Sequence, residues 1–271
     1  MASRKAVRSA RSYRGFTLIE LAVVMMILVA LAGVMVPMMS GFTDRAHDSA
    51  AATNVSELMK QIEMYNVKTE KGYPDQFDSL VSGGAIWAAS APGVTPVVPG
   101  ISPAAAVLMS PHVLTANEAA SLNNVGINNL VNMAPATDNA TAHKFILPPT
   151  TPNDLVAVAT GATVATVIDP TTPGCGLQNA DVTNNWYVIV GLGQSCTAVG
   201  VVMAAAPIHF DTIDPSIFYQ RYGVIFQIPK DGTPHAGAPA KLAGVVGIHD
   251  AGLSGLDDHI NGYNQDVQSG N

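Results

Sequence analysis

The sequence RSYRGFTLIELAVVMMILVALAGVMVPMM, residues 11–39, decides how this chain is organised. Within it, residues 16–39 form a run of 24 residues that is almost entirely apolar, and Glu20 is its only charged side chain. An α-helix rises about 1.5 Å per residue, so about 20 apolar residues suffice to cross the ~30 Å hydrocarbon core of a membrane. The run is therefore predicted to form a helix long enough to span a membrane.

Positive charge gathers in front of this apolar run. Cations that flank a membrane span stay in the cytoplasm. We therefore expect the N-terminus inside the cell and residues 42–271 outside it. Residues 1–15 contain no acid and five cations, which are Arg4, Lys5, Arg8, Arg11 and Arg14.

Two simpler interpretations of the N-terminus remain open. A secretory signal peptide has a shorter apolar core that ends in small residues at an A-x-A-like cleavage site. The stretch that mimics such a site, residues 30–33, lies inside the run rather than after it. The second alternative is an uncleaved helix that serves only as an anchor.

A single carboxylate in an apolar run needs an explanation. Placing an acid in hydrocarbon costs roughly 2.5–3.5 kcal/mol on insertion scales. Membrane solubility therefore does not account for Glu20, and its side chain is predicted to have a partner or a function. The alternative is that the carboxylate merely reaches the membrane interface.

Residues 14–20, Arg-Gly-Phe-Thr-Leu-Ile-Glu, resemble the prokaryotic N-terminal methylation motif of type IV pilins and type II secretion pseudopilins. The resemblance implies that a membrane prepilin peptidase cuts between Gly15 and Phe16 and then methylates Phe16. Glu20 becomes the fifth mature residue, where the family keeps its acid, and is implied to pair with the terminal amine of a neighbouring subunit. Pro37 falls where family members often carry a helix-kinking proline. The resemblance covers roughly residues 11–81.

The resemblance also implies partners and a location. The partners are the prepilin peptidase and methyltransferase, copies of this chain, other pilin-like subunits and inner-membrane lipid. The precursor is expected to be a single-pass protein of the inner membrane with a periplasmic or extracellular head, which enters a filament after processing.

The apolar run is predicted to continue into an amphipathic helix. Gly33 and Pro37 interrupt the run, and proline usually kinks a helix. Beyond them Val55, Leu58 and Ile62 recur at helical spacing and form a stripe that can dock on a core. We expect one helix over residues 16–69, roughly 80 Å long. The alternative is two helices broken near Gly41.

The predicted organisation has four parts. They are a cleaved basic leader, 1–15; a transmembrane and filament-core helix, 16–39; an amphipathic helix, 40–70; and an exported head, 71–271, with an irregular insertion over 82–112. Gly72-Tyr73-Pro74 is predicted to end the long helix, because glycine and proline punctuate helix ends. Thr115-Ala116-Asn117-Glu118 fits a capping box for a short helix over 116–123.

The C-terminal half of the chain is predicted to form strands. Short apolar runs rich in β-branched and aromatic residues alternate there with turn residues. Strands after one long helix predict an α+β fold in which the helix packs on an antiparallel sheet. The predicted strands cover 125–133, 155–158, 163–168, 186–190, 198–203, 217–228 and 241–248.

Charge excludes some functions. The chain has 13 basic and 20 acidic residues, a formal net charge of −7, and five of the basic residues lie in the leader. Loss of the leader leaves eight basic and 20 acidic residues, so no basic surface for nucleic acid is expected. The sequence also contains no nucleophile motif, phosphate loop or dinucleotide fingerprint. We therefore expect neither an enzyme nor a cofactor.

Cys175 and Cys196 are the only two cysteines. In an exported head such a pair is predicted to form a disulfide, which would close a loop of about 20 residues and contribute around 3 kcal/mol. Two unpaired buried thiols are the alternative.

Two groups of residues give a weak signal for a metal site. His209, Asp211, His249 and Asp250 could meet at strand ends, but their spacing matches no metalloenzyme motif, so polar residues that flank strands and turns are the simpler interpretation. Asp250, Asp257, Asp258 and Asn261 carry oxygen ligands suited to calcium, and some major pseudopilins bind calcium in a C-terminal loop. Their spacing matches no EF-hand, so a solvated loop is the simpler interpretation.

The sequence thus predicts a structural subunit of a pilus-like or type II secretion pseudopilus filament. Within that class, the alternative is a minor tip subunit with adhesive or cargo-binding loops. Outside it, the alternative is a membrane-anchored periplasmic binding protein or enzyme that uses the span as a tether.

Overall fold

The computed structural model describes residues 17–70, 72–82, 84–88, 100–132, 143–148, 155–168, 180–209, 218–250 and 252–255 of the 271. The backbone is described but the side chains are not at residues 34–45, 47, 48, 143, 144, 166 and 168. All statements on side chains below refer to the remaining residues.

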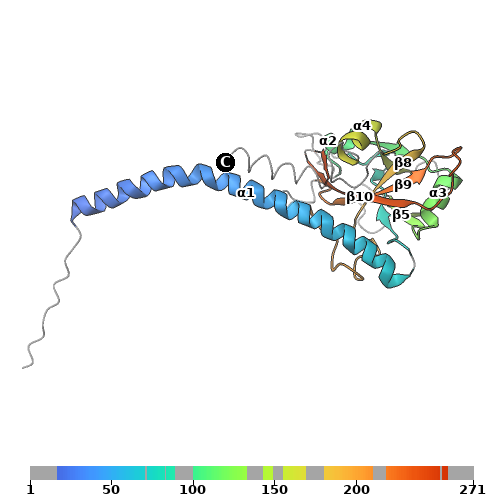
Figure 1. Cartoon of the computed structure of the whole chain (residues 1–271), viewed down its shortest axis with the longest axis horizontal. Helices are drawn as coiled ribbons and strands as arrows, with labels where there is room; N and C mark the ends of the chain where they lie inside the picture. The colour runs from blue at the N-terminus through green and yellow to red at the C-terminus, as the bar shows by residue number, and fades with distance from the viewer. Residues whose placement is uncertain are drawn as a thin grey trace, which may run out of the picture.

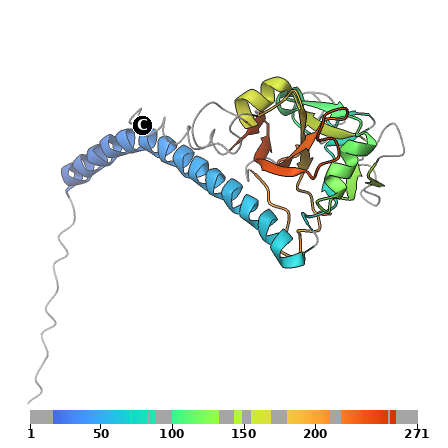
Figure 2. The same cartoon turned by 45° about the vertical axis from the view of Figure 1, so that its right-hand side comes forward.

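One continuous helix, α1 (Leu18–Thr69), dominates the molecule. It is 52 residues long. Its N-terminal half extends away from the head as a bowed stem, and its C-terminal half lies against the head (Figures 1 and 2). The prediction of a single helix over 16–69 is confirmed within two residues at its start, and the alternative break near Gly41 is wrong. Apolar side chains on the head-proximal half drive this docking, because Val55, Leu58 and Ile62 are all buried there.

The helix ends at Thr69, as predicted, although no glycine forms its cap. Glu70 is the C-cap in the left-handed region, with φ of 54°, and its N–H donates to the Asn66 carbonyl at 3.0 Å. Gly72 allows the turn that follows the helix, because its φ is +94° and a Cβ at this position would collide with the Val125 carbonyl. The Tyr73 N–H donates to that same carbonyl at 2.7 Å. The turn after α1 is thus seated on the segment that follows the short helix at 116–123.

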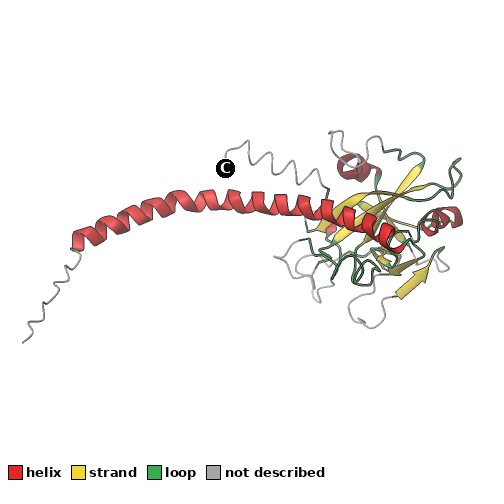
Figure 3. Cartoon of the chain, turned by 60° about the horizontal axis from the view of Figure 1, so that its bottom comes forward, coloured by secondary structure: helices red, strands yellow, loops and turns green. Residues whose placement is uncertain are grey.

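A nine-stranded sheet forms the centre of the head, in the order β11-β10-β9-β8-β1-β5-β6, with β7 pairing to β8 and β4 to β7. Every described pairing in it is antiparallel except that of β1 with β5, which is parallel. The α+β prediction is therefore confirmed (Figure 3). The strands are β1 (Phe77–Asp78), β4 (Met109–His112), β5 (Asn129–Asn132), β6 (His143–Ile146), β7 (Val156–Ala159), β8 (Asn185–Gly191), β9 (Tyr222–Pro229), β10 (Lys241–His249) and β11 (Gly252–Ser254).

Both faces of this sheet are covered. Val188, Val190 and Phe226 face the cluster that contains α1 and α3 (Ala116–Asn123). Tyr187 and Ile189, which alternate with them along β8, face a second cluster behind the sheet. The second layer includes the hairpin β2 (Val81–Ser82) and β3 (Ala85–Ile86), the short helix α2 (Pro103–Ala106), and α4 (Gly161–Thr163), which runs into a π-helix, η1 (Val164–Ile168).

Two predicted strands are wrong, for local reasons. Residues 163–168 are helical because Thr160 caps them: its hydroxyl accepts the Thr163 N–H and its carbonyl accepts the Val164 N–H. Residues 198–203 form turns, with Gly200 at φ +83° and the Val201 and Val202 N–H groups both bonded to the Ala198 carbonyl. In both cases the run has β propensity, but a helix cap or a glycine with positive φ stabilises a helix or a turn instead.

The predicted irregular segment 82–112 contains regular elements where it is described, namely β3, α2 and β4. The capping box at Thr115 is confirmed, because its hydroxyl accepts the Glu118 N–H and the Glu118 carboxylate accepts the Thr115 N–H. Residues 116–123 form the predicted helix, α3, with the expected bounds.

Candidate functional site

The start of α1 is held by a second capping box, which the sequence analysis did not identify. Thr17 is the N-cap, and its hydroxyl accepts the Glu20 N–H at 3.3 Å. Glu20 Oε2 in turn accepts the Thr17 backbone N–H and the Thr17 hydroxyl, both at 2.8 Å. The pattern T-x-x-E predicts this arrangement. A carboxylate here also lies at the positive end of the helix dipole.

The side chains of the stem, residues 17–33, are all exposed. Leu18, Met26 and Val29 are examples, with exposed fractions of 87%, 72% and 70%. Glu20 lies among these apolar side chains and lines a shallow groove of about 300 Å³ with Ile19, Val23 and Val24. Contiguous apolar surface of this extent marks a protein or membrane contact. Within the described residues, no helix is both long and apolar enough to cross a membrane.

The processing and kink residues are only partly within the described chain. Gly15 and Phe16 lie outside the described residues, immediately before the N-cap. Gly33 is part of α1, and a Cβ there would meet nothing within 4 Å. At Pro37 the backbone is helical, but the side chain is not described. The kink at Gly33 and Pro37 therefore stays a prediction.

The cysteine prediction is also untested. Cys196 is buried, no disulfide partner for it lies within the described residues, and burial raises the pKa of its thiol to about 12. Cys175 lies outside the described residues.

Of the residues predicted to bind a metal, three lie close together, but the described residues form no metal site. The imidazole rings of His209 and His249 stack with their centroids 5.4 Å apart, and His249 Nδ1 lies 3.7 Å from Asp250 Oδ1. Asp211 and the calcium candidates Asp257, Asp258 and Asn261 fall outside the described residues. Across the described ranges, no group of three or more His, Cys, Asp or Glu side chains could hold a metal ion.

In the head, Glu118 does more than complete the predicted capping box, because its carboxylate also joins distant segments of the chain. Glu118 is buried, and its two oxygens accept bonds from a helix cap, two side chains and a turn. Burial alone would raise the pKa of Glu118, but these bonds lower it to about 2. The donors are His112 Nε2 at 2.9 Å, the Thr115 N–H at 3.0 Å, Trp186 Nε1 at 2.8 Å and the Asp231 N–H at 3.3 Å.

A second buried acid, Asp78, was not identified from the sequence. Its Oδ2 accepts the Tyr219 hydroxyl at 2.7 Å, and its carboxylate packs on the backbone of Gly193, where a Cβ would collide with it. Burial raises the pKa of Asp78 to about 6, although Tyr219 and Arg221 act in the opposite direction. Asp78 carries no local sequence signal, because its partner Tyr219 lies 141 residues away. For Glu118 the capping box predicts the bonds with Thr115, but it does not predict the contacts with the distant Trp186 and Asp231.

The exposed apolar stem and the acid at its start lie in a segment that a family model also matches. Residues 10–36 match the prokaryotic N-terminal methylation motif. The chain thus carries the N-terminal signature of type IV pilin-like proteins and type II secretion pseudopilins.

One particular relative gives a longer match. The protein is similar to the type II secretion system core protein G of Dickeya chrysanthemi, with 38% identity over 64 residues. The match covers 24% of this chain and 41% of that relative, which is well under two thirds of the relative's length. No solved structure matches the chain significantly.

Proposed function

We propose that this protein is a structural subunit of a pilus-like or type II secretion pseudopilus filament. The observation that carries the proposal is the stem: apolar side chains are exposed all around residues 17–33, on a helix that is continuous with the head. Such a surface requires cover from outside the molecule. Membrane lipid covers it in the precursor, and the stems of neighbouring subunits cover it in the filament.

Processing completes the proposal. The motif match supports cleavage between Gly15 and Phe16 on the cytoplasmic side, followed by methylation of Phe16. The helix begins at Leu18, so the new terminal ammonium lies next to the N-cap. The precursor is then a single-pass inner-membrane protein with its head outside the cytoplasm.

Glu20 has a role in assembly under this proposal. Both bonds from Thr17 go to Oε2 of the carboxylate. Capping therefore occupies one oxygen, and Oε1 accepts the terminal ammonium of the neighbouring subunit. An opposite charge at close range offsets the cost of burying the carboxylate and fixes the axial register of the two stems.

The test is the intact mass of the protein from membranes and from sheared filaments. We expect a chain that begins at Phe16 and carries the mass of one added methyl group. A Gly15→Val variant should remain unprocessed, whereas Gly33→Ala, a change in open space on the same helix, should be processed normally. A mature chain that still begins at Met1, or that is cut elsewhere, contradicts the proposal.

A further inference from the structure

An open groove of about 380 Å³ runs along the flank of α1 where the helix lies on the head. One wall is polar and comes from α1, and the opposite wall is apolar and comes from the turns at 202–207. The α1 wall contains Asn54, Glu57 and Gln61, and the apolar wall contains Met203, Ala204 and Pro207.

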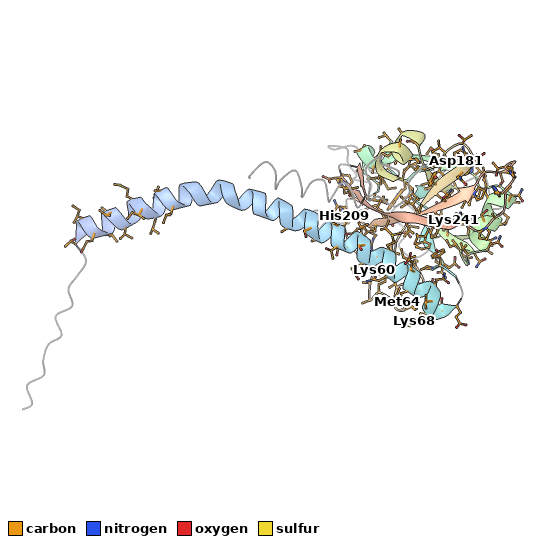
Figure 4. All side chains as sticks on the ribbon, in the orientation of Figure 1. Lys60, Met64, Lys68, Asp181, His209 and Lys241 are labelled. Carbon is orange, nitrogen blue, oxygen red and sulfur yellow. The ribbon has the colours of Figure 1, made fainter. Side chains whose placement is uncertain are left out.

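A second surface lies further along the same helix. Met64 and Val67, one turn apart, are exposed by 56% and 80%. Their neighbours Ile62 and Tyr65 are buried, so Met64 and Val67 point away from the sheet. We call this pair the Met64–Val67 patch. Figure 4 shows Met64 on α1 between Lys60 and Lys68.

The groove and the patch cannot meet within one molecule. Both belong to α1, and their centres are about eight residues apart, which is roughly 12 Å along the helix axis. A second copy that lies beside the first, shifted by that distance and turned about its own helix axis, brings its patch level with the groove of the first. Because the patch and the groove are different surfaces, the contact leaves one of each free at the ends and repeats without closing.

The chemistry of the two surfaces is complementary. The methionine and valine of the patch match the apolar wall of the groove. Lys60 and Lys68, two of the eight basic residues outside the leader, flank the patch, and Glu57 lies on the groove. Within one chain Lys60 already bonds Glu57 at 2.9 Å, but this pair is exposed and such pairs contribute little, so its exchange between copies costs little.

Resting on the proposed filament, we propose that the groove beside α1 receives the Met64–Val67 patch of a second copy of this chain. The contact sets the axial stagger between the heads of adjacent subunits. It lies outside the apolar stem, so it selects the position of a subunit whose stem could otherwise slide along its neighbours.

Cross-linking between two copies tests this contact. A full-length Met64→Cys chain and a full-length Ala204→Cys chain are co-expressed in the producing cells, and sheared filaments are oxidised. We expect a mixed disulfide dimer that is absent from the parent and from either variant alone. A matched control replaces Met64→Cys with Val107→Cys, at the C-cap of α2, where Val107 is 74% exposed, and should yield no dimer.

The outcomes separate this contact from the proposed function. Filaments that form normally but give no Met64–Ala204 dimer overturn the contact and leave the filament intact. Absence of filaments from the parent chain overturns the proposed function instead.

A second variant measures the strength of the contact. Val67→Asp should reduce filament yield about tenfold, because it removes one apolar contact of roughly 1.5 kcal/mol. The Ala204→Lys change in the same chain should restore part of the yield. Val67 is exposed, so the thermal unfolding of the head should be unchanged, and an unaltered filament yield would contradict the proposal.

Discussion

The stem and the head of this protein share one helix, α1, but the apolar side chains of its two halves are covered in different ways. In the head, side chains of α1 such as Val55 and Ile62 are buried against the sheet, and both faces of that sheet are covered by the chain itself. In the stem, residues 17–33 contact nothing outside their own helix among the described residues, and every side chain is exposed. The head therefore supplies its own core, whereas the stem depends on lipid or other subunits.

The two buried acids of the head make the same contrast with Glu20. Glu118 and Asp78 find their hydrogen-bond donors inside the chain, over long sequence separations. Among the described residues, Glu20 bonds only to Thr17, three residues away. The acid in the stem thus has one oxygen left for an external partner, and variants of these acids can separate the two regions.

The largest effect is expected at Glu20. Replacing it with valine or glutamine should abolish filaments while the protein still inserts into the membrane, because a terminal ammonium without its partner costs roughly 3–5 kcal/mol per contact when buried. Counting filaments by electron microscopy beside membrane fractionation measures both.

The choice of substituent at Glu20 sharpens this test. Glutamine at the third helical position still completes a capping box, whereas valine does not. If Glu20→Gln assembled normally and Glu20→Val did not, capping rather than charge pairing would be the function of Glu20. Thr17→Val, which removes the cap but keeps the charge, is the matched control.

The next effect belongs to the head. Glu118→Ala should destabilise it by roughly 3–5 kcal/mol, because four donors lose their acceptor in a buried position. Both tryptophans, Trp87 and Trp186, lie in the head, so their fluorescence in urea reports its unfolding alone. Processing at Phe16 should be unaffected. A loss no larger than that of the exposed control Glu57→Ala would contradict the role given to Glu118.

A smaller effect should depend on pH. The pKa of Asp78 is raised from 3.8 to about 6 by burial, so its protonated form contributes stability that is fully present below pH 3.8 and lost as the pH rises through 6. The loss amounts to about 3 kcal/mol. Asp78→Asn should remove this slope between pH 4 and 7 in urea unfolding of the full chain in detergent.

The control for Asp78 is an exposed acid with the opposite shift. Hydrogen bonds from Asn184 lower the pKa of Asp181, so it titrates below that pH window. Asp181→Asn should therefore leave the slope between pH 4 and 7 unchanged. An identical slope in the parent and in Asp78→Asn would show that other groups cause it.

The smallest effect on stability is expected at Lys60. Its exposed pair with Glu57 should contribute no more than about 0.5 kcal/mol, so Lys60→Ala should leave head unfolding almost unchanged. Filament yield should nevertheless fall, because Lys60 flanks the Met64–Val67 patch. A change in head stability without any change in assembly would reverse the assignment of Lys60.

Local signals predicted the elements that depend on local contacts. The helix α3 has the predicted bounds because Thr115 and Glu118 complete each other within one turn, and α1 continues through residue 69 because its apolar stripe is regular. The strand predicted at 163–168 failed because the Thr160 cap outweighs the β propensity of this run. The Thr163 hydroxyl, which donates to the distant Leu108 carbonyl at 2.6 Å, adds a contact that no local pattern reveals. The same limit hid the role of Asp78, whose partner Tyr219 lies 141 residues away, and the contacts of Glu118 with Trp186 and Asp231.

The turn after α1 has a mechanical consequence. A filament under tension transmits force from the stem to the head, and the turn is where the helix is tied to the sheet. Asp75 takes most of that connection: Oδ1 accepts the Asn128 and Asn129 N–H groups, Oδ2 accepts Asn129 Nδ2, and the Asp75 N–H donates to Thr197 Oγ1 at 2.8 Å. These four hydrogen bonds act in parallel, so a pulling force is divided among them. The connection between helix and sheet therefore resists a larger force than any one of the bonds alone.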